Sequence, residues 1–339
     1  MTPVELSRTV LCAVRRAVDQ GELSVAVPAR AVVTAPGPGG RGDYATNIAL
    51  QLARPAGRPP RQVAEILRPH LSRTEGVADV EITGPGFLNI HLDGTAATAL
   101  VRSVQQGAYG HSDALQGEVV ELRIPYDVRA EVVADALVRI IATQGGRVEV
   151  EHTEPVNLRP VPAPEDPAPL GLDAARWALL HPATHDRPRI TADHLVQRAS
   201  NPLFRVRYAH ARARALHRNA AALGFTSIPG DVRDLPPAQG SPRDLSCASA
   251  PPSHHPLLTA LAEYPRALTQ AAAHRAPDRV ARQLVSVADA LLLFQHTVLP
   301  RGDEKPSAAH RARLALAEAA GTVLVGGLSL LGIDAPEHL

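Results

Sequence analysis

Apolar residues at helical spacing predict a helix over residues 1–20 and a second helix, opened by prolines, over Pro59–Leu71. A third run at helical spacing covers Tyr44–Leu52. Short runs rich in β-branched and other apolar residues predict strands at Leu23–Val27, Ala31–Thr34, Val77–Ile82 and Phe87–Leu92. The turn-forming residues Thr83–Gly86 join the last two runs. We therefore expect a compact α/β domain over residues 1–106.

The next segment, residues 107–154, has the pattern of one βαβ unit. Strands are expected at Glu118–Ile124 and Arg147–Glu151, with an amphipathic helix between them at Val128–Thr143. Because parallel sheets normally carry helices on both faces, a single unit of this kind resembles a remnant of a larger Rossmann-type sheet. A proline-rich stretch follows over residues 155–170, and we expect an extended connector there.

Helical patterns dominate residues 171–339. Apolar residues at alternating steps of four and three form a stripe typical of a helical bundle, namely Val280, Leu284, Val287, Leu291, Phe294 and Val298. The stretch Thr226–Ser253 has no such periodicity, which predicts a long loop. The predicted fold class is a multidomain α+β protein: an N-terminal α/β domain, a residual βαβ linker domain (a Rossmann fragment) and a C-terminal all-α helical bundle.

Charge and cysteine content narrow the classes of function. A net charge of +1 is too low for bulk binding to nucleic acid, so any RNA contact must come from local patches. Arginine supplies every basic side chain except Lys305. Cys12 and Cys247 form no C-x-x-C pair, which favours a reducing, cytoplasmic compartment over a zinc finger or a disulfide framework. The charged first helix is unlike a signal peptide, and the absence of about 18 consecutive apolar residues predicts no membrane span.

The first pattern suited to RNA lies on the strand predicted at Phe87–Leu92. Residues two apart on a strand point to the same face, so Phe87 and Asn89 offer a stacking ring beside an amide. This combination suits an unstacked loop base. The structural alternative is that Phe87 packs in the core and Asn89 caps a turn.

The second pattern is a basic helix. The segment from Arg198 to Arg218 contains no acidic residue and has a local charge of about +6. Its arginines are Arg198, Arg205, Arg207, Arg212, Arg214 and Arg218. The 3.6-residue period places Arg207, His210, Arg214, His217 and Arg218 on one face, beside the i, i+4 pair Phe204 and Tyr208. The alternative is a solvated face on an arginine-rich surface.

Three segments of this chain closely resemble bacterial arginyl-tRNA synthetases. The first segment comprises Gly42–Leu50, Ala53–Pro60 and Gly84–Ile90. The second comprises Asp173–Leu180, Asn201–Phe204 and Tyr208–Arg212. The third comprises Ala312–Ala319, Gly327–Leu328 and Leu331–Glu337. The third match is imperfect, because Gly321, Gly326 and Gly327 weaken a helix and suggest an altered anticodon pocket.

This resemblance implies a domain that reads a D-loop base at the tRNA elbow, and a DALR-type anticodon-binding domain over residues 171–339. The elbow-binding residues that it implies are Asn47, Gln51, Phe87 and Asn89. The anticodon or RNA-binding residues that it implies are Phe204, Arg207, Tyr208, His210, Arg212, Arg214 and Arg218.

The catalytic signatures of the resembled family are missing. A class I synthetase needs an H-x-G-H signature and a K-M-S-K-like loop to neutralise ATP phosphates, and this sequence has neither. The loop between the first strand and helix of the βαβ unit is reduced to Pro125–Val128. The glycine-rich stretch Gly37–Gly42 lacks the Lys-Ser/Thr of a P-loop, and Pro182 interrupts the His181–His185 pair. We expect no catalytic residue, cofactor or metal.

Four functional hypotheses follow from these patterns. The first is a non-catalytic paralogue of arginyl-tRNA synthetase that binds tRNA, most of all tRNA(Arg). The second is an adaptor that presents tRNA to a tRNA-modifying or aminoacyl-transferring enzyme. The third is residual ligase activity, and the fourth is a structural descendant that oligomerises through the Val280–Val298 stripe. No DNA or membrane partner is expected.

Overall fold

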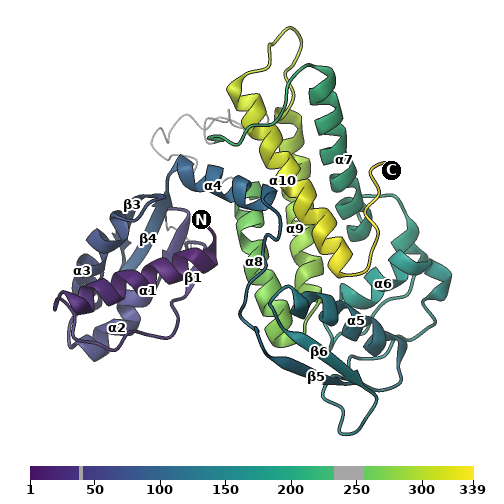
Figure 1. The fold of residues 1–339 in the computed structure, drawn as a ribbon, viewed down its shortest axis with the longest axis horizontal. Helices are drawn as coiled ribbons and strands as arrows, with labels where there is room; N and C mark the ends of the chain where they lie inside the picture. Colours follow the sequence, from purple (N-terminus) through teal and green to yellow (C-terminus); the bar gives the residue numbers. More distant parts are fainter. Residues whose placement is uncertain (38–40, 233–255) are drawn as a thin grey trace. The chain divides into compact units, whose positions relative to one another are not determined.

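The computed structural model describes residues 1–37, 41–232 and 256–339 (Figure 1). The chain divides into two compact units, which are described separately below. The first comprises residues 1–100 and 229–262, and the second comprises residues 101–228 and 263–339. Most of the loop predicted at Thr226–Ser253 lies outside the described residues.

The first unit contains a four-stranded antiparallel sheet with the order β1-β2-β4-β3. Its elements are α1 (Pro3–Asp19), β1 (Val33–Thr34), β2 (Tyr44–Thr46), α2 (Ile48–Ala56), α3 (Pro60–Ser72), β3 (Val77–Thr83), β4 (Phe87–Leu92) and the start of α4 (Gly94–Gln105). The predicted helices over residues 1–20 and 59–71 and the predicted β3–β4 hairpin are confirmed. Leu6 and Val10 of α1 and Leu67 of α3 are buried in one core cluster with Leu88 and Ile90 of β4.

Two predicted boundaries in this unit are wrong. Residues 23–27 form no strand. Residues Tyr44–Thr46 are a strand and not the first turn of a helix, because they pair in register with Leu88–Ile90 of β4. Tertiary pairing with a neighbouring strand overrides an apolar spacing that is compatible with either structure.

The second unit begins with the predicted βαβ arrangement. Strand β5 (Val119–Arg123) and strand β6 (Arg147–Glu151) are parallel and are connected by helix α5 (Val128–Ala142). The connector then closes the free edge of β5: the Asn157 side chain accepts from the Arg123 backbone N at 2.9 Å and donates to the Glu121 carbonyl at 3.1 Å. The proline-rich stretch stays extended up to a short 3₁₀ turn at Ala168–Leu170, as expected from its composition.

The rest of the second unit is helical. It contains α6 (Leu172–Leu180), α7 (Pro202–Ala222), the part of α8 (Pro256–His274) from Glu263 onward, α9 (Asp278–Phe294) and α10 (Ala308–Leu330), with 3₁₀ turns at Ala192–Leu195 and Gln295–Thr297. All six residues of the stripe from Val280 to Val298 are buried. The stripe is therefore domain core, and the hypothesis that it forms an open oligomerisation face is wrong.

Helix α10 is long and apolar enough to cross a membrane by length and composition alone, and it is the one such helix in the described ranges. Most of its apolar window, 61%, is buried within the chain. Its buried residues include Leu314, Leu316 and Leu324. A core helix of a helical bundle has this same composition, because most of its surface meets other helices.

Helix α5 is tied to α6 by a buried arginine. Arg129 is 0% exposed, and it donates five hydrogen bonds to backbone carbonyls, those of Leu179, Val161, Asp186, Pro182 and Ala183, at 2.7–3.2 Å. Several of these carbonyls lie at or just beyond the carboxyl end of α6, where a helix leaves its last carbonyls without intrahelical partners. A cation at this end also complements the helix dipole.

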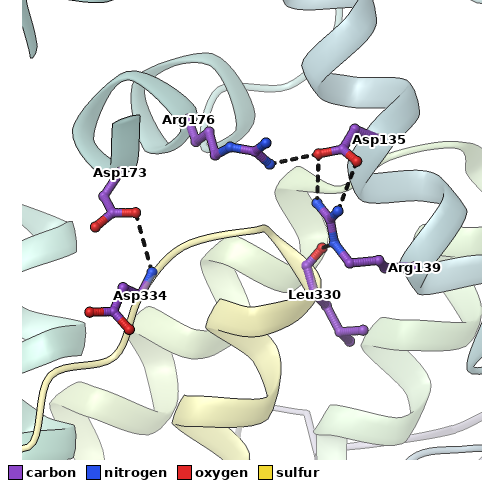
Figure 2. Close-up of polar contacts among 6 residues, drawn as sticks. All are labelled: Asp135, Arg139, Asp173, Arg176, Leu330 and Asp334. Atoms are coloured by element: carbon purple, nitrogen blue, oxygen red, sulfur yellow. Dashed lines mark hydrogen bonds and ion pairs between the residues drawn. The ribbon is translucent and has the colours of Figure 1, made fainter. Parts of the chain in front are cut away.

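A second polar network joins α5, α6 and the end of α10 (Figure 2). Asp135 accepts two hydrogen bonds from Arg139, at 2.8 and 3.0 Å, and one from Arg176 at 2.6 Å. Arg139 also donates to the Leu330 carbonyl at 2.8 Å. Burial opposes ionisation of Asp135, but the hydrogen bonds from Arg139 and Arg176 outweigh it and lower the pKa of this carboxyl. The βαβ unit is thus bonded to the bundle through ionised groups.

Candidate nucleic-acid interface

The first candidate surface lies at one end of the β2–β4 strand pair. The last pair in register is Thr46 with Leu88, so Asn47 and Phe87, the next residues outward, lie at the same end. Phe87 is 41% exposed. Gln51, one helical turn beyond Asn47, donates to the Asn47 side chain at 2.9 Å. We call Asn47, Gln51 and Phe87 the elbow surface.

Glycine sets the position of Phe87. Gly86 has φ +140°, and a Cβ at this residue would lie 2.8 Å from the backbone carbonyl of Pro60, so a side chain cannot fit. The turn therefore lies directly against the start of α3. The alternative that Phe87 packs in the core does not hold, because its ring remains exposed at the edge of this turn.

The conspicuous Gly42–Tyr44 motif has a structural role. Gly42 has φ +106°, and a Cβ there would come within 3.0 Å of the Ile90 carbonyl. The Asp43 carboxylate accepts from the backbone N of Leu92 at 2.7 Å, and Tyr44 is buried. These contacts fix β2 against β4 and so place Asn47.

Asn89 differs from the sequence expectation in its accessibility. It is 2% exposed, and its side-chain Nδ2 donates to the Thr83 hydroxyl at 3.1 Å. Thr83 is the register partner of Phe87, so this bond links the two strands beside the turn. In this structure Asn89 supports the turn, as in the structural alternative, while Phe87 alone of the two is open to a ligand.

The second candidate surface lies on α7. Asn201 caps the helix by accepting from the backbone N of Leu203 at 3.1 Å, and Pro202 occupies the first helical position. Phe204 and Tyr208 stack with ring centroids 5.6 Å apart and planes 16° apart, as their spacing predicts. Tyr208 is 37% exposed. The aromatic pair is therefore available at the edge of the helix.

The basic residues of α7 largely contact partners within the chain. Arg207, His210, Arg214 and Arg218 lie on one face, as expected, and all four meet residues 334–338. Arg207 donates to the Asp334 carbonyl at 2.9 Å and also pairs with Asp173. The remaining contacts are His210 with the Pro336 carbonyl, Arg214 with Glu337 at 2.9 Å, and Arg218 with His338 at 3.4 Å.

Other basic residues of this helix also have partners within the chain. Arg205 meets Asp289 of α9 at 2.9 Å, and His217 meets Glu318 of α10 at 2.6 Å. Arg212 donates to the Gln295 side chain at 2.7 Å. Three of the six arginines that give the local charge of about +6 therefore meet an acid, and α7 is a weaker electrostatic footprint than its composition suggests. Sequence patterns do not reveal these acidic partners, because they lie 84 to 123 residues along the chain from the basic residues that they meet, or 34 residues in the case of Asp173.

His210 makes this face sensitive to pH. It is 4% exposed, and burial lowers its pKa, with Arg214 acting in the same direction against the hydrogen bond to Pro336. Since a carbonyl only accepts, Nδ1 of neutral His210 donates to the Pro336 oxygen. The unfolded chain binds this proton more readily than the folded chain does. The contribution of His210 to the free energy of unfolding is therefore present above the pKa that this residue has in the unfolded chain. It is lost as the pH falls through the pKa of His210 in the folded chain.

We expect the free energy of unfolding to decrease between about pH 7.5 and about pH 5.5. Glutamine in the His210→Gln variant keeps a donor toward Pro336 and cannot titrate. The free energy of unfolding of this variant should therefore decrease less than that of the parent over the same pH interval. Urea unfolding of both proteins at the two pH values measures the difference. Equal losses in the parent and the variant would show that His210 does not contribute.

Other candidate sites from the sequence have no supporting geometry. His181 stacks on the Trp177 ring, with centroids 5.1 Å apart, instead of facing His185. Within the residues that the structure describes, there is no group of three or more His, Cys, Asp or Glu side chains that could hold a metal ion. Residues 38–40 of the glycine-rich stretch lie outside the described residues.

Family models match both candidate surfaces. The arginyl-tRNA synthetase N-terminal domain matches residues 5–92, which contain the elbow surface, and the DALR anticodon-binding domain matches residues 206–339. The second match begins within α7 and includes Tyr208, while Phe204 lies two residues before it. The two models leave residues 93–205, including the βαβ unit, unmatched.

Relatives found by sequence match part of the chain, and a solved structure aligns with all of it. The arginine–tRNA ligase of Renibacterium salmoninarum is 44% identical over 167 residues, and that of Frankia alni is 40% identical over 164 residues. Each match covers 45% of this chain and only 30% of the relative. The structure of Thermus thermophilus arginyl-tRNA synthetase aligns over 100% of both chains, with a TM-score of 0.65 and 15% identity, which shows a shared fold.

Proposed function

Because this chain combines an arginyl-tRNA synthetase N-terminal domain with a DALR anticodon-binding domain, we propose that it binds tRNA through both. The elbow surface contacts an unstacked base of the D-loop, and the Phe204–Tyr208 pair contacts the anticodon stem-loop. The observation that carries this proposal is the exposed ring of Phe87 at the same end of the β2–β4 pair as Asn47, whose side chain bonds to that of Gln51.

The elbow surface has the chemistry that RNA loops require. Sequence-specific RNA recognition targets bases that are splayed out of a helix, where they stack on aromatic rings and bond to amides. Stacking of one base on an aromatic side chain contributes about 1–3 kcal/mol. The amides of Asn47 and Gln51 bond to each other and retain further donor and acceptor capacity for a base edge.

The α7 surface is suited to stacking more than to charge. Tyr208 has an exposed face, whereas Arg207 and Arg214 are engaged by Asp173 and Glu337. We propose that the aromatic pair makes the principal contact at the anticodon end. The arginines hold residues 334–338 in place beside it and so shape the surface.

We further propose that the protein does not ligate arginine to tRNA. The β5–α5 junction offers only Pro125, Tyr126 and Asp127 where a class I synthetase would carry its histidine signature. Arg129, the nearest buried cation, is fully used by backbone carbonyls. The names of the relatives, which are arginine–tRNA ligases, suggest tRNA(Arg) as the ligand. The cytoplasmic location that we propose rests on the cysteine pattern of the sequence. Arginine-dependent pyrophosphate exchange should stay at background, and measurable exchange would contradict the non-catalytic role.

Phe87→Ala is expected to weaken tRNA binding about tenfold, because a base loses its stacking partner. Filter binding with purified tRNA at low salt measures the dissociation constant. Val32→Ala is the matched control, since Val32 is an exposed apolar residue of the same unit, at 47% exposure, and its loss should leave the affinity unchanged. Absence of saturable binding by the parent protein would refute the proposed function.

A further inference from the structure

Two arginines extend the elbow surface along α2. Gln51 and Arg54 follow Asn47 at steps of four and three, so the three side chains lie on one face of the helix. This face is the solvent side, since the buried residues of α2 are Ile48, Ala49, Leu52 and Ala53. Arg58 follows directly after Gly57, which ends the helix in a left-handed conformation. Arg54 and Arg58 are both exposed.

The two ends of this stretch approach the strand end that carries Phe87. At one end, Asn47 follows Thr46, whose register partner is Leu88. At the other end, Pro60 lies against Gly86, and Arg58 is two residues before Pro60. A nucleotide stacked on Phe87 would therefore have its flanking backbone within the reach of long side chains from this stretch.

The charge of these arginines is not offset. Within the described ranges, neither Arg54 nor Arg58 has a hydrogen bond or ion pair from its side chain to another residue, and α2 contains no acidic residue. Three of the five arginines of α7, by contrast, meet an acid: Asp173, Asp289 or Glu337. Arg54 also complements the dipole at the end of α2, but this effect is small for an exposed side chain and does not involve Phe87.

We infer that Arg54 and Arg58 bind the phosphates on either side of the base that stacks on Phe87. This inference rests on the proposed function. It also assigns the salt-dependent part of RNA binding to the N-terminal domain, although the longest run of arginines in the sequence is in α7. Arginine suits the task because its planar guanidinium bonds to two phosphate oxygens at once.

The test is the salt dependence of tRNA binding by the full chain. Each phosphate contact contributes about 0.7–0.9 to the slope of log affinity against log salt concentration. Arg54→Gln and Arg58→Gln should each lower this slope by about 1, and the double variant by about 2. At about 0.15 M salt the double variant should bind tRNA at least tenfold more weakly than the parent.

Arg68→Gln and Arg73→Gln form the matched control. Both residues are exposed arginines of the same unit, in or next to α3, and no partner is described for either side chain. Their slopes should equal that of the parent. If the parent binds tRNA, either of two results would overturn the inference. One is a salt slope of the Arg54/Arg58 double variant equal to that of the parent, and the other is an equal decrease of the slope in the control variants. Failure of the parent to bind tRNA would instead refute the proposed function.

Discussion

Arg129→Met is expected to destabilise the second unit by on the order of 3–5 kcal/mol. Methionine retains much of the volume but provides no donor. Five carbonyls would then lose a charged donor, and the bonds to two of them, those of Leu179 and Ala183, are fully buried. Burial lowers the pKa of Arg129, yet arginine stays protonated in proteins, so the native interaction is that of a full cation.

Urea unfolding followed by circular dichroism measures the loss, because most helices of the protein belong to the second unit. Arg129→Lys should fall between the parent and the methionine variant, since an ammonium group has three donors for five acceptors. Arg159→Met is the control: this side chain is 66% exposed and makes one ion pair at 3.4 Å, so the change should stay within about 0.5 kcal/mol. A methionine variant as stable as the parent would show that the carbonyls find other partners.

Arg129 also marks a limit of reasoning from sequence. The periodicity of residues 128–143 predicted the helix and its buried apolar face, and the structure confirms both. Nothing in that periodicity separates Arg129 from an ordinary solvated arginine, because its partners are backbone carbonyls. A carbonyl occurs at every residue and therefore leaves no signature in the amino-acid sequence.

The α7 face shows the same limit for side-chain partners. Helical period correctly placed Arg207, His210 and Arg214 together, since it depends only on local geometry. The charge of the face could not be predicted in this way. It depends on Asp173 and Glu337, which tertiary folding brings to the helix from both sides in the sequence. Local patterns thus located this surface but overestimated its positive charge.

Motifs were more informative at the elbow surface, because tight turns leave a clear glycine signature. Gly84–Phe87 predicted a hairpin turn with an aromatic residue at its exit, and the structure has both. The burial of Asn89 was not predictable. It depends on the hydrogen bond to Thr83 and on the position of β4 between β2 and β3.

The glycines of α10 were expected to weaken the helix, yet the helix is continuous from Ala308 to Leu330. Packing explains two of the three. A Cβ at Gly321 would lie 3.1 Å from the Ala213 Cβ of α7, and a Cβ at Gly327 would lie 2.4 Å from Leu284 Cδ2 of α9. Gly326, the third, has no atom within 4 Å of such a Cβ. Close approach of α9 therefore leaves no room for a side chain at 327, and that of α7 leaves little room at 321, while 326 is open.

Substitution of the neighbouring glycines by alanine should consequently have opposite effects. Gly326→Ala is expected to raise the free energy of unfolding by about 1 kcal/mol, because alanine restricts the unfolded chain and favours helix. Gly327→Ala is expected to lower it by about 1–3 kcal/mol, since Leu284 is fully buried and cannot move without disturbing the core. The two melting temperatures should differ by several degrees, about 2–4 °C for each kcal/mol in a domain of this size. Equal stabilisation by both substitutions would show that Leu284 can adopt another rotamer, and that α10 and α9 do not depend on Gly327 for their close packing.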